Sequence, residues 1–325
     1  WVYTFRGGIK TIVWTDTLQT LCMLVAVVLT IVFIGQEMQL GLGGLISKVQ
    51  SSDYAQIFFF DNGWSAKQNF FKQFISGMFI AIVMTGLDQD MMQKNLSCRN
   101  IKEAQLNMFS FSVVLLFVNL LFLGLGALLY LYAQQLGIDT PGKTDLLYPT
   151  IALQHLSPFV GIVFVLGLIA AAYSSADSAL TALTTSFCID FLGFKKTSDV
   201  TAIAQQKRLR FITHIGFSVL LFLVILIFWF INDDAVISQI FKVAGYTYGP
   251  LLGLYAFGFF TKLQINDKLA PAVCIAAPIL TYVINIYSEQ LLFGYKFGFE
   301  LLLLNGLLTF VGLLLISNKN TVVTV

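Results

Sequence analysis

Long apolar runs make up most of the chain, and short polar segments separate them. Because a bilayer core requires about 20 apolar residues per helix, these runs predict eight membrane spans. The spans lie at residues 10–35, 73–93, 108–133, 157–191, 209–231, 236–261, 269–288 and 298–318. The fourth run is too long for one perpendicular crossing, so we expect it to tilt or to project into the cytoplasm. Residues 36–72 and 134–156 are polar and turn-rich and are expected to form the two long connections.

This pattern predicts an all-α fold, a polytopic helical bundle in which residues 1–325 form a single transmembrane domain. The composition agrees, because 57% of the residues are hydrophobic and 11% are charged, with a mean hydropathy of +0.81. A soluble domain has roughly a quarter charged residues. The chain begins with Trp1 and has no signal peptide, so we expect it to be the C-terminal part of a longer domain.

The charged and sulfur-bearing residues exclude several classes of protein. The net charge is +2 and the basic residues are scattered, so no surface that could follow the phosphates of a nucleic acid is expected. The four cysteines show neither metal-ligand spacing nor a disulfide framework. An enzyme is not expected either, because no nucleophile–base pair or metal-ligand set is present.

The distribution of Lys and Arg predicts the orientation in the membrane. Thirteen of these residues fall on one side of the eight spans and six on the other. The six are Lys48, Lys67, Lys72, Lys143, Lys242 and Lys296, of which Lys72 and Lys242 can lie within spans. We therefore expect a multi-pass protein of the plasma or inner membrane, in contact with lipid, with both ends of this chain in the cytoplasm.

The fourth span contains small, hydroxylated and acidic residues at 170–179 where a lipid-facing helix would have large apolar ones. An acid inside a membrane is costly and is by default a functional candidate. At 100° per residue the segment forms two overlapping oxygen-bearing clusters. They are Ala171 with Ser174 and Ser175, and Ser174 with Asp177 and Ser178. A hard cation such as Na⁺ prefers such oxygens, although small residues also serve tight helix–helix contacts.

Asp16 lies just inside the first span, beside Thr15, Thr17 and Gln19. A carboxylate at this depth must face the bundle interior or a hydrated cavity. The alternative is an interfacial acid that pairs with Lys10 or Arg6 and anchors the end of the helix.

The second span ends in the polar block Met84–Lys94, which contains Gly86. Polar groups and a glycine in the last turns resemble a discontinuous helix that lines a cavity, with Thr85 and Gln89 as the residues of interest. The alternative is a helix that emerges into the cytoplasm with Asp88 and Asp90 solvated, and for Asp90 we favour it.

The sixth span contains Gly245, Gly249 and Pro250 close to Lys242. Proline removes a backbone donor and clashes with the preceding turn, so a kink or hinge is predicted here. The lysine and the tyrosines on this segment favour a gating or substrate-facing role over an ordinary packing kink. His155 and His214 are isolated in the sequence and are assigned no chemistry.

Three blocks together resemble the sodium/solute symporter family, the group of the sodium–glucose, proline and sialic acid cotransporters. They are Gly7–Gln19, with its Gly-Gly and Trp-Thr-Asp elements, Gly86–Lys94 with Glu103-Ala104-Gln105, and the Ser174-Ser175 helix that ends in Cys188-Ile189-Asp190. The resemblance implies the LeuT-type inverted-repeat fold, two five-helix repeats around a site at the membrane midplane. It makes the first span here the fifth core helix and the Ser174 helix the eighth.

The resemblance also implies which residues bind the ion and the solute. One Na⁺ would be held by the Ala171 carbonyl and the hydroxyls of Ser174 and Ser175. A second Na⁺, found in some members, would correspond to Asp16, Ser174, Asp177 and Ser178. The candidate substrate residues are Met84, Thr85, Gln89 and Lys242. Sugar-transporting members have an aromatic gate, an Asn and a Lys at positions that match Met84, Ala81 and Leu115, so hexose transport is not expected, and Lys242 is compatible with an anionic substrate.

The function predicted is sodium-coupled symport, in which alternating access imports a small organic solute such as a sugar, sialic acid, an amino acid or a carboxylate. Na⁺ is the expected coupling ion. One alternative is proton coupling on the same fold, with Asp16 or Asp177 as the carrier. Another is a transporter-like sensor domain of a signalling protein, which a long soluble extension after Val325 would favour.

Overall fold

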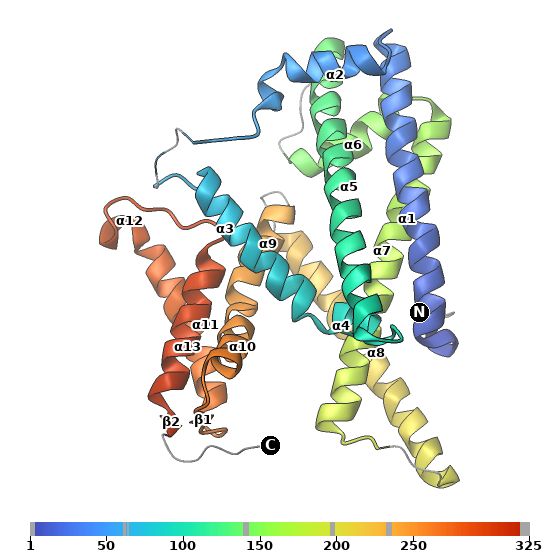
Figure 1. The fold of residues 1–325 in the computed structure, drawn as a ribbon. Helices are drawn as coiled ribbons and strands as arrows, with labels where there is room; N and C mark the ends of the chain where they lie inside the picture. The colour runs from blue at the N-terminus through green and yellow to red at the C-terminus, as the bar shows by residue number, and fades with distance from the viewer. Residues whose placement is uncertain are drawn as a thin grey trace. The chain divides into compact units, whose positions relative to one another are not determined.

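The computed structural model describes residues 4–60, 63, 65–138, 143–195, 199–231 and 236–318, and it is mostly helical (Figure 1). The chain divides into two compact units. Unit 1 consists of Trp1–Ala55 and Gln93–Asp233, and unit 2 consists of Gln56–Met92 and Asp234–Val325. Each unit is described by itself below.

Unit 1 contains the long helices of the chain. Its elements are α1 (Thr4–Glu37), α2 (Leu42–Gln50), the 3₁₀ turn η1 (Asp53–Ala55), α5 (Ile101–Leu136), the 3₁₀ turn η3 (Thr144–Leu146), α6 (Leu147–Thr150), the π-helical turn η4 (Ile151–His155), α7 (Pro158–Ser186), the π-helical turn η5 (Phe187–Phe191) and α8 (Val200–Ile231). Helix α4 (Gln89–Leu96) lies across the boundary between the units. The sequence sets the ends of α5, because the Asn100 side chain accepts a hydrogen bond from Glu103 N at 2.9 Å and Gly137 closes the helix with φ = 66°.

Helices α1 and α7 lie side by side and form the most extensive contact in unit 1 (Figure 1). A glycine permits their close approach, because a Cβ at Gly167 would lie 3.3 Å from Ala26 Cβ. Nearby, the buried Thr30 hydroxyl lies 2.8 Å from the Tyr148 hydroxyl. The α1–α7 pair is therefore held by small-residue packing, and a buried hydrogen bond joins α1 to α6.

Unit 2 contains shorter helices. Its elements are α3 (Phe70–Ala81), the π-helical turn η2 (Ile82–Gly86), α9 (Val236–Thr247), α10 (Gly249–Phe260), β1 (Gln264–Ile265), α11 (Ala270–Ile286), α12 (Ser288–Leu291), α13 (Leu301–Leu315) and β2 (Ser317–Asn318). The two strands pair antiparallel, with Gln264 opposite Asn318. They tie the segment after α10 to the end of α13.

Glycines bring α10 and α13 together (Figure 1). A Cβ at Gly253 would lie 2.5 Å from Thr309 Cβ, and one at Gly249 would overlap the side chain of Asn305. Both Thr309 and Asn305 are fully buried. Small residues at a helix interface let backbones approach closely, which is how helices associate in lipid.

Asn305 also stabilises the break between α9 and α10. Pro250 has no N–H, so the carbonyl of Tyr246, four residues earlier, has no helical donor. The Asn305 amide nitrogen donates to that carbonyl at 2.7 Å and to the Gly245 carbonyl at 3.1 Å. A side chain on α13 thereby satisfies the Tyr246 carbonyl that the proline frees on α9, and it also binds the neighbouring Gly245 carbonyl.

The predicted spans compare with the structure as follows. Four helices are long and apolar enough to cross a membrane among the residues described: Asp16–Glu37, Ile101–Leu136, Pro158–Phe191 and Val200–Phe230. The other four predicted spans coincide with shorter apolar helices: Phe70–Gly86, Gly249–Phe260, Ala270–Ile286 and Leu301–Leu315.

Several details of the predicted pattern are corrected. The spans at 73–93 and 236–261 are each divided, one at Leu87–Asp88 and the other at Tyr248, so the predicted interruption before Pro250 is confirmed. Residues 298–300 are not helical. The connections at 36–72 and 134–156 contain α2, α6 and η4, because amphipathic segments were hidden among their polar residues. The strands β1 and β2 are a small exception to the all-α class.

Replacing Asn305 by alanine tests the bridge between α13 and the interruption. The variant leaves the Gly245 and Tyr246 carbonyls without their side-chain donor and opens a void, which we expect to cost about 2–4 kcal/mol of unfolding free energy. The control is Asn107→Ala, because Asn107 is exposed on α5. Thermal unfolding in detergent should show a clear fall in melting temperature for Asn305→Ala alone, and equal melting temperatures for the two variants would contradict this role.

Candidate functional site

The α1–α7 contact in unit 1 brings together two of the predicted ion-site elements. The Gln19 side-chain nitrogen donates to the Ala171 carbonyl oxygen at 3.4 Å. The carbonyl predicted to bind Na⁺ therefore has a side-chain amide from the first span beside it. Ser175 is exposed, and the Ser174 side chain lies outside the part of the structure that is described.

Asp177 and Ser178 are both buried, each with 5% of its surface exposed. The Ser178 hydroxyl has no hydrogen-bond partner among the described residues. Asp177 interacts electrostatically with His214 on α8, and His214 Nδ1 lies 3.1 Å from the Thr184 hydroxyl. The structure thus gives His214 a polar setting that its isolated position in the sequence did not indicate.

Asp16 forms an ion pair with Lys94, at 3.1 Å between carboxylate and ammonium. Both side chains are about a quarter exposed. Neither alternative partner, Lys10 or Arg6, has a described side chain. Of the two carboxylates of the predicted second Na⁺ site, Asp16 is therefore paired with the Lys94 ammonium in this conformation, whereas Asp177 is buried in α7.

In unit 2 the two interrupted helices meet. Helix α3 continues into the π-helical turn η2, ends before Leu87, and is followed by α4. Asp88 stands at this break, where one carboxylate oxygen accepts from Met91 N at 3.4 Å in the manner of an N-cap. Its other oxygen accepts from the Tyr248 hydroxyl at 3.2 Å. Tyr248 is the residue between α9 and α10, so one hydrogen bond joins both interruptions.

The predicted substrate residues lie at different points of unit 2. Met84 and Thr85 are half-buried in η2, and Gln89 is exposed at the start of α4. Single π-helical turns are frequent at functional sites, and the predicted discontinuity of this helix is confirmed. Lys242 is on α9, six residues before Tyr248, and it lines a cavity that none of Met84, Thr85 and Gln89 reaches.

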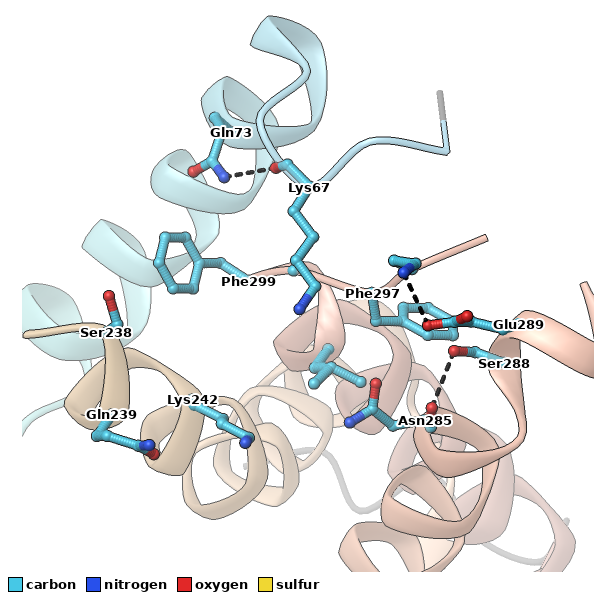
Figure 2. A pocket seen from close by; sticks show the side chains of 13 residues that line it. Lys67, Gln73, Ser238, Gln239, Lys242, Asn285, Ser288, Glu289, Phe297 and Phe299 are labelled. Atoms are coloured by element: carbon cyan, nitrogen blue, oxygen red, sulfur yellow. Dashed lines mark hydrogen bonds and ion pairs between the residues drawn. The ribbon is translucent and has the colours of Figure 1, made fainter. Parts of the chain in front are cut away.

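That cavity has a volume of about 530 Å³ and lies where α9 begins and α11 ends (Figure 2). Its charged lining residues are Lys67, Lys242, Lys296 and Glu289. Lys296 pairs with Glu289 at 3.1 Å. Lys67 and Lys242 are exposed, and their ammonium groups have no ion-pair partner among the residues described. Lys67 and Lys242 thus give the cavity two positive charges that no described acidic side chain neutralises.

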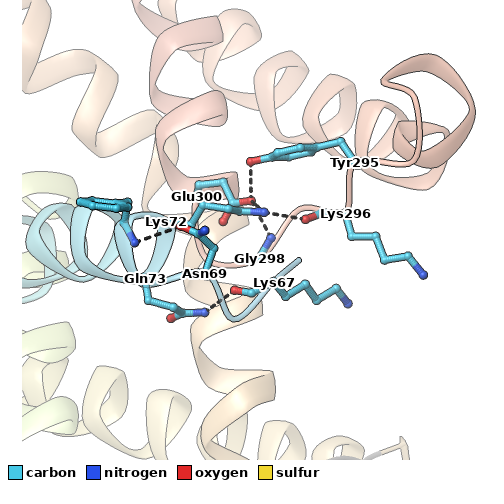
Figure 3. A network of polar contacts seen from close by, with 9 residues as sticks. Lys67, Asn69, Lys72, Gln73, Tyr295, Lys296, Gly298 and Glu300 are labelled. Carbon is cyan, nitrogen blue, oxygen red and sulfur yellow. Dashed lines mark hydrogen bonds and ion pairs between the residues drawn. The ribbon is translucent and has the colours of Figure 1, made fainter. Parts of the chain in front are cut away.

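A buried ion pair fixes one wall of the cavity (Figure 3). The Lys72 ammonium lies 3.0 Å from the Glu300 carboxylate and donates to the Lys296 carbonyl at 3.0 Å. The same Glu300 oxygen accepts from the Tyr295 hydroxyl and from Gly298 N, each at 2.9 Å. Burial and the hydrogen bond to Glu300 hold the pKa of Tyr295 above its usual value, so the phenol remains a donor.

These features define a multi-pass helical membrane protein with two interrupted helices. Residues 1–270 match the sodium:solute symporter family, and the chain belongs to that family.

Named relatives agree with this assignment. The sodium/sialic acid symporter NanT of Aliivibrio fischeri is 25% identical over 287 residues, 86% of this chain and 55% of the relative. Sodium-coupled monocarboxylate transporter 2 of Bos taurus is 26% identical, over 87% of this chain and 46% of the relative. The sodium-dependent multivitamin transporter of Oryctolagus cuniculus is 27% identical, over 88% and 45%. The chain spans about half the length of the curated relatives it matches. No solved structure gives a significant match.

Sequence reasoning did not find several residues that the structure makes important. Lys94 belongs to the same polar block as Asp88, but the sequence did not show that it reaches Asp16. Asn305 and Glu300 were not singled out, and their only signal is that they are polar residues in or beside an apolar run. Lys67 entered only the count of basic residues, because it comes from a connection and lines a cavity with Lys242 only in the folded unit.

Two glutamates, each paired with a lysine, provide a matched test of the buried network. Glu300→Gln leaves the Lys72 charge buried, and removing one partner of a buried pair costs about 3–5 kcal/mol. Glu289→Gln breaks a pair in which both side chains are more than half exposed, so about 1 kcal/mol or less is expected. Chemical unfolding of both variants measures the difference. If Glu300→Gln were no less stable than Glu289→Gln, the network would not hold the wall.

Proposed function

We propose that this chain is part of a sodium-coupled symporter that imports a small organic anion by alternating access on a LeuT-type inverted-repeat fold. Family membership and the sodium-coupled relatives support the coupling ion. Lys67 and Lys242 of the unit 2 cavity have no ion-pair partner among the described residues and support an anionic solute, and this observation carries the choice of substrate class. The Lys and Arg count supports cytoplasmic ends and outward-facing Lys67 and Lys242.

We assign the first Na⁺ to the Ala171 carbonyl with the hydroxyls of Ser174 and Ser175. That carbonyl already accepts a hydrogen bond in this conformation, from the side-chain amide of Gln19. Oxygen ligands of this kind replace part of the hydration shell of a hard cation. The nearby Gln19 amide would have to turn its own oxygen toward the ion, because its nitrogen now occupies the carbonyl.

A second Na⁺ is assigned to Asp16, Ser174, Asp177 and Ser178. The buried Ser178 hydroxyl, which lacks a hydrogen-bond partner among the described residues, fits a ligand role. Lys94 supplies the positive charge at Asp16 in this conformation. The second ion would therefore compete with Lys94, and its binding should be weaker than that of the first.

Met84, Thr85, Gln89 and Lys242 remain the proposed substrate-facing residues. They belong to the two interrupted helices that the Asp88–Tyr248 hydrogen bond joins. Broken helices expose backbone groups that can bind ions and polar solutes at the middle of a membrane. We therefore propose that solute binding alters the Asp88–Tyr248 hydrogen bond and in this way favours the alternation between conformations.

The function is tested by uptake into vesicles that contain the full-length protein. A panel of sialic acid, monocarboxylates, amino acids and sugars is offered with Na⁺, and then with choline in its place while the pH gradient is held constant. We expect uptake of an acidic solute that requires Na⁺. Uptake that survives in choline and follows the pH gradient would instead establish proton coupling, with Asp16 or Asp177 as the carrier.

Serine-to-alanine variants test the first ion site. Losing one ligand oxygen should weaken Na⁺ binding by about 1–3 kcal/mol. Ser174→Ala and Ser175→Ala should each raise the Na⁺ concentration for half-maximal uptake by about ten-fold or more. Ser112→Ala, at an exposed position of α5, should leave it unchanged. An unchanged Na⁺ dependence in both test variants would remove the ion from this helix.

A further inference from the structure

Lys67 and Lys242 extend their ammonium groups into the same cavity from different elements (Figure 2). Lys67 precedes α3, whereas Lys242 is on α9, so 175 positions of sequence separate them and only the fold brings them together. Like charges repel, and two ammonium groups at one small cavity favour an anion between them. Glu289, the acidic residue among the described residues of the lining, already pairs with Lys296, so these lining residues offer no carboxylate to Lys67 or Lys242.

The remaining lining distinguishes an organic anion from an inorganic one. Phe297 and Phe299 present aromatic rings to the cavity, and Gln73, Ser238 and Gln239 add hydrogen-bonding groups. A cavity of about 530 Å³ is within the range of small-molecule sites, which combine apolar walls with a few polar groups that fix orientation. Chloride or phosphate would fill little of this volume and would gain nothing from the rings.

The site is held in shape before a ligand arrives. Residues 296–299, which form its aromatic wall, are tied to α3 by the Lys72–Glu300 pair through the Lys296 carbonyl and Gly298 N (Figure 3). Phe299 also packs against Phe241 of α9, with ring centroids 5.2 Å apart. A preformed wall lowers the cost of ordering the site on binding.

We propose that this cavity is an outer capture site for the carboxylate group of the transported solute, with Lys67 as its dedicated cation. The inference rests on the proposed symport function and adds to it a second position of the solute. Lys242 is six residues before Tyr248, about 9 Å along a helix. A solute released from Lys67 can therefore keep its contact with Lys242 while it moves toward the Asp88–Tyr248 junction.

The test uses the full-length protein in proteoliposomes at saturating Na⁺, with L-lactate and N-acetylneuraminate as probes. Lys67→Gln should raise the KM for the acidic probe by about three- to ten-fold and leave the maximum rate within about two-fold. Lys67→Arg keeps the charge and should retain the wild-type KM.

Lys48→Gln is the control, because Lys48 bonds to Gln135 in unit 1 and is predicted to face the same side of the membrane. Added choline chloride should narrow the gap between wild type and Lys67→Gln, since salt screens exposed charges.

Calorimetric measurement of probe binding in detergent distinguishes a failure of the capture site from a failure of the symport function. Na⁺-dependent uptake with an unaltered KM in Lys67→Gln overturns the capture site and leaves the symport function standing. Probe binding that Lys67→Gln weakens, without any Na⁺-dependent uptake, overturns the function and keeps the site. Displacement of the probe by chloride at equal affinity would mean that the cavity binds simple anions, and it would overturn the assignment to a carboxylate. A wild-type protein that neither binds nor transports the probes overturns both.

Discussion

The carbonyl of Tyr246 sets the main constraint on this fold. Pro250 removes its helical donor, and in a membrane a buried carbonyl without a partner is costly. The amide of Asn305 supplies the donor, and the glycine at position 249 leaves room for that side chain against the helix. The interruption between α9 and α10 is therefore stabilised by a buried polar side chain of α13.

The interruption in turn positions the chemistry. It leaves Tyr248 free of a regular helix, and the Tyr248 hydroxyl reaches Asp88 at the second interruption. Upstream of the break, α9 carries Lys242 into the cavity beside Lys67. In unit 1 Asp16 is paired with Lys94, and Asp177 and Ser178 are buried on α7. Among the described residues, unit 2 thus has two cavity lysines without an acidic partner, and unit 1 has a buried hydroxyl without a hydrogen-bond partner, which fits the proposed symport of Na⁺ and an organic anion.

The sequence predicted the helical class, the positions of the apolar helices and both interruptions, because hydropathy, glycine and proline act locally. Family motifs predicted the membership that residues 1–270 confirm. The features that the sequence did not predict depend on contacts between distant segments. Lys94 reaches Asp16 only through the arrangement of α4 and α1, and the partnership of Lys72 with Glu300 requires α3 to dock on α13. Local patterns give no information on such pairs, and the Ser174, Ser175 and Asp177 ligand roles stay predictions.

Reciprocal coupling provides the most direct test of the symport account. If Na⁺ and an organic anion favour the same conformational states, a gradient of either one must drive transport of the other, because coupling free energies are reciprocal. Proteoliposomes with the full-length protein and equal Na⁺ on both sides are given an inward gradient of unlabelled N-acetylneuraminate or L-lactate, with the membrane potential clamped at zero. The account predicts that the gradient drives net uptake of labelled Na⁺ into the vesicles. Equilibration of the solute without any net movement of Na⁺ would contradict it.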